Sequence, residues 1–191
     1  MRSLVVPVLF SSERKVVQTT SASLTTTDIH VLCLEPPRMG ARVSMALQLP
    51  DRHRPEIVVG EVSETTRADP AAPEPGFRAT FVDLIPSARR RIAAAIAKSE
   101  SEGRVYKRMP AQLKIHIVGD GSLDARDISA VGVFVPGLTG PERPLELALG
   151  FDDGLAATKA LVVRTEEQGA GLQFVDSTRD FRVRLDRYLA E

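Results

Sequence analysis

Two short patterns in the second half of the sequence contain residues that could recognise a ligand. Arg104 and Arg108 form an R-x-x-x-R pattern, and 19 positions after Arg108 begins a D-x-S-x-x-G pattern made by Asp127, Ser129 and Gly132. A guanidinium is a planar, permanently charged fork that can bond a phosphate at two points or match the O6/N7 edge of guanine. A carboxylate accepts N–H groups, a hydroxyl both donates and accepts, and a glycine leaves the backbone bare. The chemistry open to such a set is the binding of a small anionic ligand.

Neither pattern carries this interpretation alone. Arginines four residues apart are common on protein surfaces, and a D-x-S-x-x-G stretch is usually a turn in which the Asp and Ser side chains bond their own backbone. The order of the two patterns and the elements around them therefore decide the interpretation.

The second half of the chain predicts a β-rich unit that ends in a helix. Apolar residues alternate at 113–117 and again at 145–149, and continuous β-type runs lie at 131–136, 160–164 and 171–176, with turns at 119–121 and 152–154. Residues 181–189 then carry apolar side chains at helical spacing, with Arg182, Arg184 and Arg187 largely outside the apolar face.

The first half repeats this order. Strands are predicted at 4–10, 29–34, 43–49, 56–63 and 77–82, followed by a helix at 85–96 in which Arg89, Arg90 and Arg91 mostly face water. Phe81-Val82-Asp83 matches Phe174-Val175-Asp176. The polar stretch 98–103 has the composition of a linker, so the sequence predicts two domains, 1–98 and 104–191. Strands without crossover helices predict an all-β fold: two tandem six-stranded antiparallel barrels, each with one C-terminal helix.

The second domain resembles the PilZ family. Residues 104–189 contain both signature patterns in the family's order, and the segments 137–149 and 169–174 resemble its supporting frame. The resemblance implies that cyclic di-GMP is the ligand and that Arg104 and Arg108 bind its phosphates and guanines. It also implies that Asp127, Ser129 and Gly132 shape the surface beneath.

The first domain is interpreted as a degenerate PilZ-like domain. Alignment on the apolar run places Thr25 opposite Asp127, Thr27 opposite Ser129 and His30 opposite Gly132, and no arginine pair precedes Thr25 at a comparable distance. We therefore expect this domain to have a structural or partner-contacting role.

The leading functional hypothesis is a cyclic-di-GMP receptor or adaptor. Binding at the interdomain hinge would change the domain arrangement and so the contact with an unidentified protein partner, in bacterial motility or surface behaviour as the family implies. The alternative is a PilZ-like interaction scaffold that does not bind the nucleotide.

Composition and the remaining motifs narrow the other possibilities. The 25 Lys and Arg residues balance 25 Asp and Glu residues, which argues against a nucleic-acid partner. Cys33 is the only cysteine, so no internal disulfide forms and a cytoplasmic location is expected; no apolar run reaches the length of a membrane span. His30 and Cys33 have no further ligands nearby to complete a zinc site, and Asp152-Asp153 reads as a turn. No catalytic motif is found, so we expect no enzyme, cofactor or metal.

Overall fold

The computed structural model describes residues 4–12, 15–67, 74–103, 105–119, 121–139 and 144–190. These residues form two compact units, and the boundary between them falls between Val105 and Tyr106. Both units are built from antiparallel strands and end in one helix, so the predicted all-β class is confirmed.

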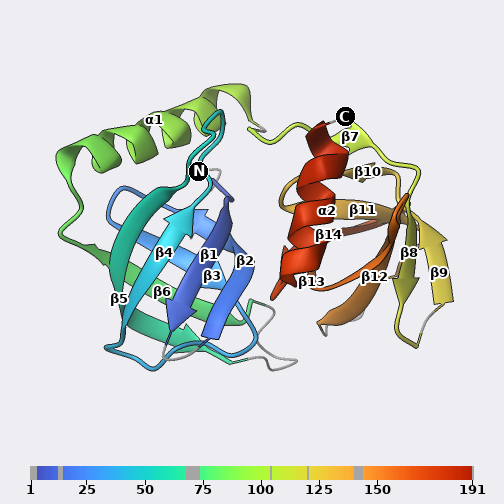
Figure 1. Ribbon diagram of the computed structural model, residues 1–191, viewed down its shortest axis with the longest axis horizontal. Coiled ribbons are helices and arrows are strands. Elements are labelled where there is room, and N and C mark those ends of the chain that lie inside the picture. Colours follow the sequence, from blue (N-terminus) through green and yellow to red (C-terminus); the bar gives the residue numbers. More distant parts are fainter. Residues whose placement is uncertain are drawn as a thin grey trace. The chain divides into compact units, whose positions relative to one another are not determined.

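The first unit is a closed barrel of six strands in the order β1-β2-β3-β6-β5-β4 (Figure 1). The strands are β1 (Pro7–Ser12), β2 (Lys15–Leu24), β3 (Asp28–Leu32), β4 (Arg42–Leu47), β5 (Glu56–Thr66) and β6 (Gly76–Val82). Burial alternates along them, as in β4 where Val43, Met45 and Leu47 are buried, so one face of every strand fills the barrel. Because the barrel closes, its strands leave no unpaired edge.

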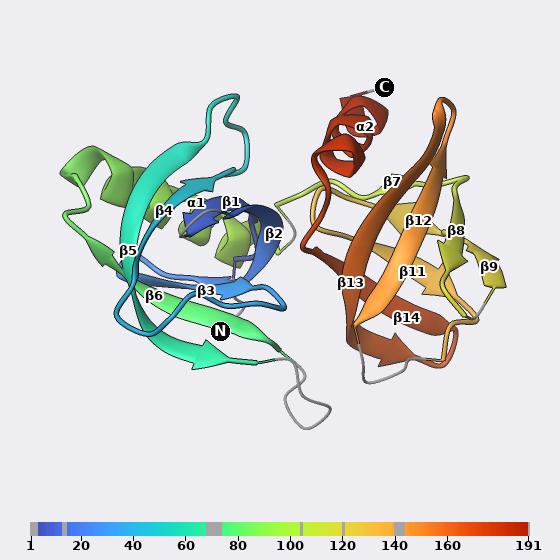
Figure 2. The ribbon, with the colours of Figure 1, turned by 60° about the horizontal axis from the view of Figure 1, so that its bottom comes forward.

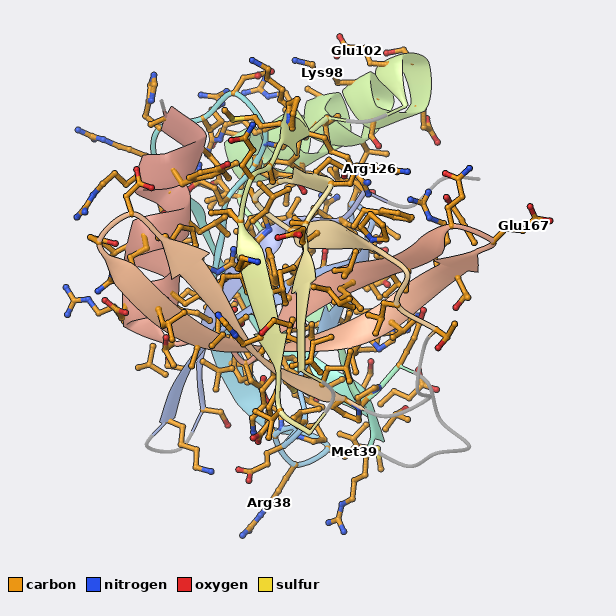
Figure 3. All side chains as sticks on the ribbon, turned by 90° about the vertical axis from the view of Figure 1, so that its right-hand side faces the viewer. Arg38, Met39, Lys98, Glu102, Arg126 and Glu167 are labelled. Carbon is orange, nitrogen blue, oxygen red and sulfur yellow. The ribbon has the colours of Figure 1, made fainter. Side chains whose placement is uncertain are left out.

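Helix α1 (Pro86–Glu102) lies across one end of the barrel and buries Ala88, Ile92, Ala95 and Ser99 (Figure 1). It begins with Pro86 in its first turn and ends at Gly103, whose φ of 80° suits glycine and whose N–H bonds the Ser99 carbonyl at 2.9 Å. The prediction of a flexible linker at 98–103 is therefore wrong for 98–102, which are the last turns of the helix. Lys98, labelled with Glu102 in Figure 3, pairs with Asp51, a tertiary contact of this polar end of the helix.

The second unit is a curled eight-stranded sheet in the order β7-β10-β11-β14-β13-β12-β8-β9 (Figure 2). Its strands are β7 (Met109–Pro110), β8 (Lys114–Ile117), β9 (Gly121–Asp124), β10 (Asp127–Ile128), β11 (Gly132–Pro136), β12 (Leu145–Phe151), β13 (Gly154–Glu166) and β14 (Gly169–Val175). The count exceeds the predicted six because β7 and β10 are two-residue strands and β9 folds back on β8, which alternating hydrophobicity does not reveal.

Helix α2 (Arg179–Ala190) closes the core of the second unit with Phe181 and Leu185. The Thr178 hydroxyl accepts the Phe181 N–H at 3.1 Å and so caps the start of the helix. The expected position of Arg182 outside the packed face is wrong, because this side chain is only 8% exposed. Its role is described below.

The internal repeat extends to local geometry. Asp83 and Asp176 both have a positive φ, 52° and 44°, and both directly precede the segment that enters the helix. Strands β5 and β13 each carry a bulge, after Val62 and Val162 respectively. This confirms the predicted match of 81–83 with 174–176 and fixes which residues of the two units correspond.

Candidate functional site

The R-x-x-x-R and D-x-S-x-x-G patterns meet in the second unit. Arg104 lies outside the described residues, and Arg108 immediately precedes β7, which pairs with β10 and so places Arg108 beside Asp127. Arg108 Nη1 donates to Asp127 Oδ1 at 2.6 Å, with the two side chains 28% and 17% exposed. The ion pair is thus partly open to solvent and lies on the outer face of the sheet, because its neighbour Ile128 points into the core.

A second arginine shares the same carboxylate. Arg126 Nε donates to Asp127 Oδ2 at 3.1 Å, and the Arg126 guanidinium lies 3.8 Å from the centroid of the Phe134 ring. Phe134 faces Asp127 across the β10–β11 pair, so the ring lies on the outer face as well. The sequence reasoning did not single out Arg126 or Phe134. The position of Arg126 beside Asp127 was the available signal.

Ser129 shapes the turn between β10 and β11. The Ser129 N–H donates to the Gly132 carbonyl at 2.9 Å, and the Ser129 hydroxyl donates to the same oxygen at 3.3 Å. The hydroxyl oxygen also accepts the Val131 N–H at 3.4 Å. The side chain is buried. The structure thus gives Ser129 a backbone-fixing function; its contact with a ligand stays a prediction.

Gly132 is required by the neighbouring strand. A Cβ at this position would lie 2.2 Å from the carbonyl oxygen of Leu172 on β14, far inside any allowed contact. The close approach of these two strands therefore explains the glycine without a ligand, and the role of Gly132 in the surface beneath a ligand stays a prediction.

Arg182 holds the same turn from the core side. Its Nη1 donates to the Ala130 carbonyl at 2.6 Å. Burial lowers the pKa of the guanidinium to about 10, against the opposing effects of Asp186 and Tyr106, and burial likewise raises the pKa of Asp186. At neutral pH Arg182 is still charged, so a buried cation bonds the middle of the D-x-S-x-x-G turn. A helical pattern alone could not show this, because the partner is a backbone carbonyl 52 residues away.

The alignment of the two halves at this turn is corrected by two residues. In the first unit the Thr25 N–H donates to the Asp28 carbonyl at 2.9 Å and the Thr27 N–H to the Thr25 hydroxyl at 3.1 Å, the pattern made by Ser129 in the second unit. Thr25 therefore corresponds to Ser129, and not to Asp127 as the sequence alignment had it. An apolar run cannot distinguish registers that differ by two, because side chains alternate with that period.

With the corrected register, Ser23 corresponds to Asp127, Asp28 to Gly132 and His30 to Phe134. The first unit thus keeps the hydroxyl of the turn, in Thr25. It lacks the acid and the glycine.

Other predicted features have simple environments. Cys33 is buried, and His30 Nδ1 lies 3.9 Å from a carboxylate oxygen of Glu74. Arg91 is an exception to the expected solvated arginine run, since it binds Glu56 through two nitrogens at 2.6 and 2.8 Å. Within the described residues no group of His, Cys, Asp and Glu is arranged to hold a metal ion. In the same part of the chain, neither helix combines the length and apolar character needed to cross a membrane.

Comparisons with known proteins give similarities to solved structures alone. No protein-family model matches the chain, and no curated protein sequence matches it either. The inhibitor of motility from Bacillus subtilis (MotI/DgrA) is 13% identical, with 100% of this chain and 96% of that chain covered and a TM-score of 0.39. The MrkH–c-di-GMP complex of K. pneumonia is 13% identical, with 97% and 85% covered and a TM-score of 0.32. YcgR of Escherichia coli in complex with c-di-GMP is 12% identical, with 97% and 82% covered and a TM-score of 0.35. At these identities and TM-scores the similarities carry no argument about function, so the functional proposal rests on the residues of this chain.

Proposed function

We propose that the second unit binds cyclic di-GMP and that the chain is a non-catalytic receptor for this nucleotide. The observation that carries the proposal is the contact of Arg108 with Asp127, because it brings the two separate sequence patterns into one partly exposed site. The choice of cyclic di-GMP as the ligand follows from the resemblance of these two patterns, in this order, to the PilZ signature.

The chemistry of the pair fits this ligand. A guanidinium has five N–H donors, and the described contact with Asp127 uses one of them. Arg108 can therefore keep its carboxylate partner and still bond a phosphate oxygen or the O6/N7 edge of guanine. Asp127 can accept N–H groups of guanine, and Ser129 and Arg182 hold the turn that carries it.

The position of the arginines suggests how binding is transmitted. Arg104 and Arg108 flank the unit boundary at Val105 and Tyr106, so a ligand that orders this segment restricts the two units relative to each other. The proposed output is altered contact with a protein partner. Small-angle scattering with and without cyclic di-GMP tests this step, and superimposable profiles at saturation would contradict it.

Isothermal titration with cyclic di-GMP tests the binding itself. We expect saturable binding by the intact chain and a loss of about tenfold to a hundredfold in affinity for Arg108→Gln, because one charged hydrogen bond contributes about 1.5–3 kcal/mol. Arg104→Gln should behave alike. Lys107→Gln, an exposed charge on the same segment, is the matched control and should bind as the wild type does. Equal affinity in all four proteins would refute the site, and no binding by the wild type would refute the receptor.

A further inference from the structure

On the outer face of the second unit, the ring of Phe134 lies beneath two arginine side chains. Val133 and Val135 belong to the core, whereas Phe134 between them points to the opposite face and is nevertheless fully buried. Two guanidiniums lie near it: that of Arg126, 3.8 Å from the ring centroid, and that of Arg164, 5.9 Å from it. Charged side chains thus lie over a phenyl ring on the face that carries Asp127.

A glycine allows the second of these arginines to lie along the sheet. Gly171 faces Phe134 on one side and Arg164 on the other in the β11–β14–β13 register. A Cβ at Gly171 would lie 3.5 Å from both Cβ and Nε of Arg164, so the arginine already rests against the bare backbone. A larger side chain here would lift Arg164 off the strand.

The face carries more positive than negative charge. Three arginines meet there, and Asp127 accepts from two of them, Arg108 and Arg126. Arg164 pairs with Glu166 at 2.9 Å. Arg126 and Arg164 are 47% and 38% exposed, so both guanidiniums can be reached from solvent; Figure 3 labels Arg126 on this unit.

We propose that Arg126 and Arg164 are further ligand-binding residues of this site. Arg126 lies over the Phe134 ring, and in the proposed complex its guanidinium stacks on a guanine while Arg164 bonds a phosphate. The inference rests on the proposed function, and it deepens it: the dianionic nucleotide is bound by arginines of the R-x-x-x-R segment on one side and by this second pair on the other.

The corresponding positions of the first unit support the assignment. Glu64 stands where the second unit has Arg164, and His30 stands where it has Phe134. An acid at the position of Arg164 would repel a phosphate. The pair of arginines over an aromatic ring is thus confined, among these matched positions, to the unit that carries the two sequence patterns.

Titration calorimetry with cyclic di-GMP tests the proposal on Arg126→Gln, Arg164→Glu and Arg126→Lys in the full chain. We expect Arg126→Gln to bind about tenfold to a hundredfold more weakly and Arg164→Glu at least as weakly, because a phosphate then meets a carboxylate. Arg126→Lys should lie between wild type and Arg126→Gln, since it keeps the charge and loses the plane. Lys107→Gln is the control for general loss of positive charge, and circular dichroism melting verifies that each variant is folded.

The outcomes separate this inference from the function on which it rests. Wild-type binding with unchanged affinity in Arg126→Gln and Arg164→Glu overturns the inference and leaves the receptor standing. Affinity of Arg126→Lys equal to that of the wild type would show that charge alone is needed at this position and would overturn the stacking role of Arg126. No binding by the wild type overturns both. Should Arg126→Gln fail to fold, Arg164→Glu decides alone, because Arg164 is partly exposed and its guanidinium can be replaced without placing the new carboxylate in the core.

Discussion

Each unit contains a turn with the same hydrogen bonds, but the charged side chains on the surface beside this turn differ between the units. In the first unit Asp28 takes the position of Gly132, and Arg78 takes the position of Gly171. Arg78 Nη1 donates to Asp28 Oδ1 at 2.6 Å, and its Nε lies 3.4 Å from Glu64. The first unit therefore neutralises this surface with its own side chains.

In the second unit glycines stand at both of these positions. The three arginines around them, Arg108, Arg126 and Arg164, have two carboxylate partners, Asp127 and Glu166. The comparison shows two differences at this surface: the first unit has Glu64 where the second has Arg164, and it has an internal ion pair where the second has bare backbone. The hydrogen bonds of the turn are independent of both, since Thr25 and Ser129 make them equally.

The largest expected effect comes from adding a side chain at the glycine of the turn, where the first unit has Asp28. Gly132→Ala places a Cβ within 2.2 Å of the Leu172 carbonyl, so the β11–β14 contact must shift. Overpacking of this kind costs about 1–3 kcal/mol of the free energy of unfolding, and the displaced turn should abolish ligand binding.

Thermal melts and titrations of Gly132→Ala check this expectation, with Gly150→Ala as the control. A Cβ at Gly150 would meet only ordinary contacts, the nearest at 3.6 Å. Equal melting temperatures for the two variants would contradict the account of the strand approach.

The next effect tests whether the buried guanidinium positions the turn. Arg182→Met keeps much of the side-chain volume but removes the donor to the Ala130 carbonyl. We expect affinity for cyclic di-GMP to fall about tenfold, with faster amide exchange at 129–132, because the turn loses its anchor on the core side. Arg187→Met, on an exposed position of the same helix, should change neither quantity. Unaltered exchange in Arg182→Met would remove the positioning role.

A smaller effect is expected from breaking the ion pair of the first unit. Asp28→Asn removes a carboxylate whose pKa lies below its ordinary value. Burial raises this pKa, but hydrogen bonds from Thr25, Thr27 and Arg78 together lower it by more. Because Arg78 is 43% exposed, the loss should stay below about 1 kcal/mol, and ligand affinity should not change. Urea unfolding and the nucleotide titration measure the two quantities. A change in affinity would show that the first unit takes part in binding.

The smallest effect is a pH dependence confined to the first unit. Burial lowers the pKa of His30, as does Arg78, while Glu74 and Glu64 oppose the shift. The unfolded chain therefore binds this proton more readily than the folded one. The contribution of His30 to stability is complete above its ordinary pKa of 6.5 and declines as the pH falls below that value.

His30→Gln should thus reduce the difference in melting temperature between pH 7.5 and pH 5.5. The same difference in the variant and the wild type would show that His30 does not cause this pH dependence, since the carboxylates titrate alike in both proteins.

The sequence predicts much of the fold because its evidence is local. Alternating apolar positions locate most strands, and the repeat of Phe-Val-Asp before each helix has the same cause in both units, an Asp with a positive φ. The sequence does not locate the end of α1, because polar residues at 98–102 are compatible with both a linker and an exposed helix end. The ion pair of Lys98 with Asp51, 47 residues away, is the tertiary contact that a local pattern lacks.

The site was predictable only where its residues lie in one motif. Arg108 and Asp127 were found because their spacing is recognisable, and they do meet. Arg164 and Gly171 join the same face through the register of β13 with β14, and Arg182 through a bond to a carbonyl. Each of these depends on which strands are neighbours, so no spacing in the chain indicates it.

The most direct measurement is a map of the nucleotide's contacts by amide chemical shifts on the isotope-labelled intact chain. The account predicts that cyclic di-GMP shifts the amides of 105–110, 126–136 and 164–173 in the second unit and leaves 23–32 and 76–82 of the first unit unchanged. Shifts concentrated at those first-unit positions, or none at saturating nucleotide, would contradict it.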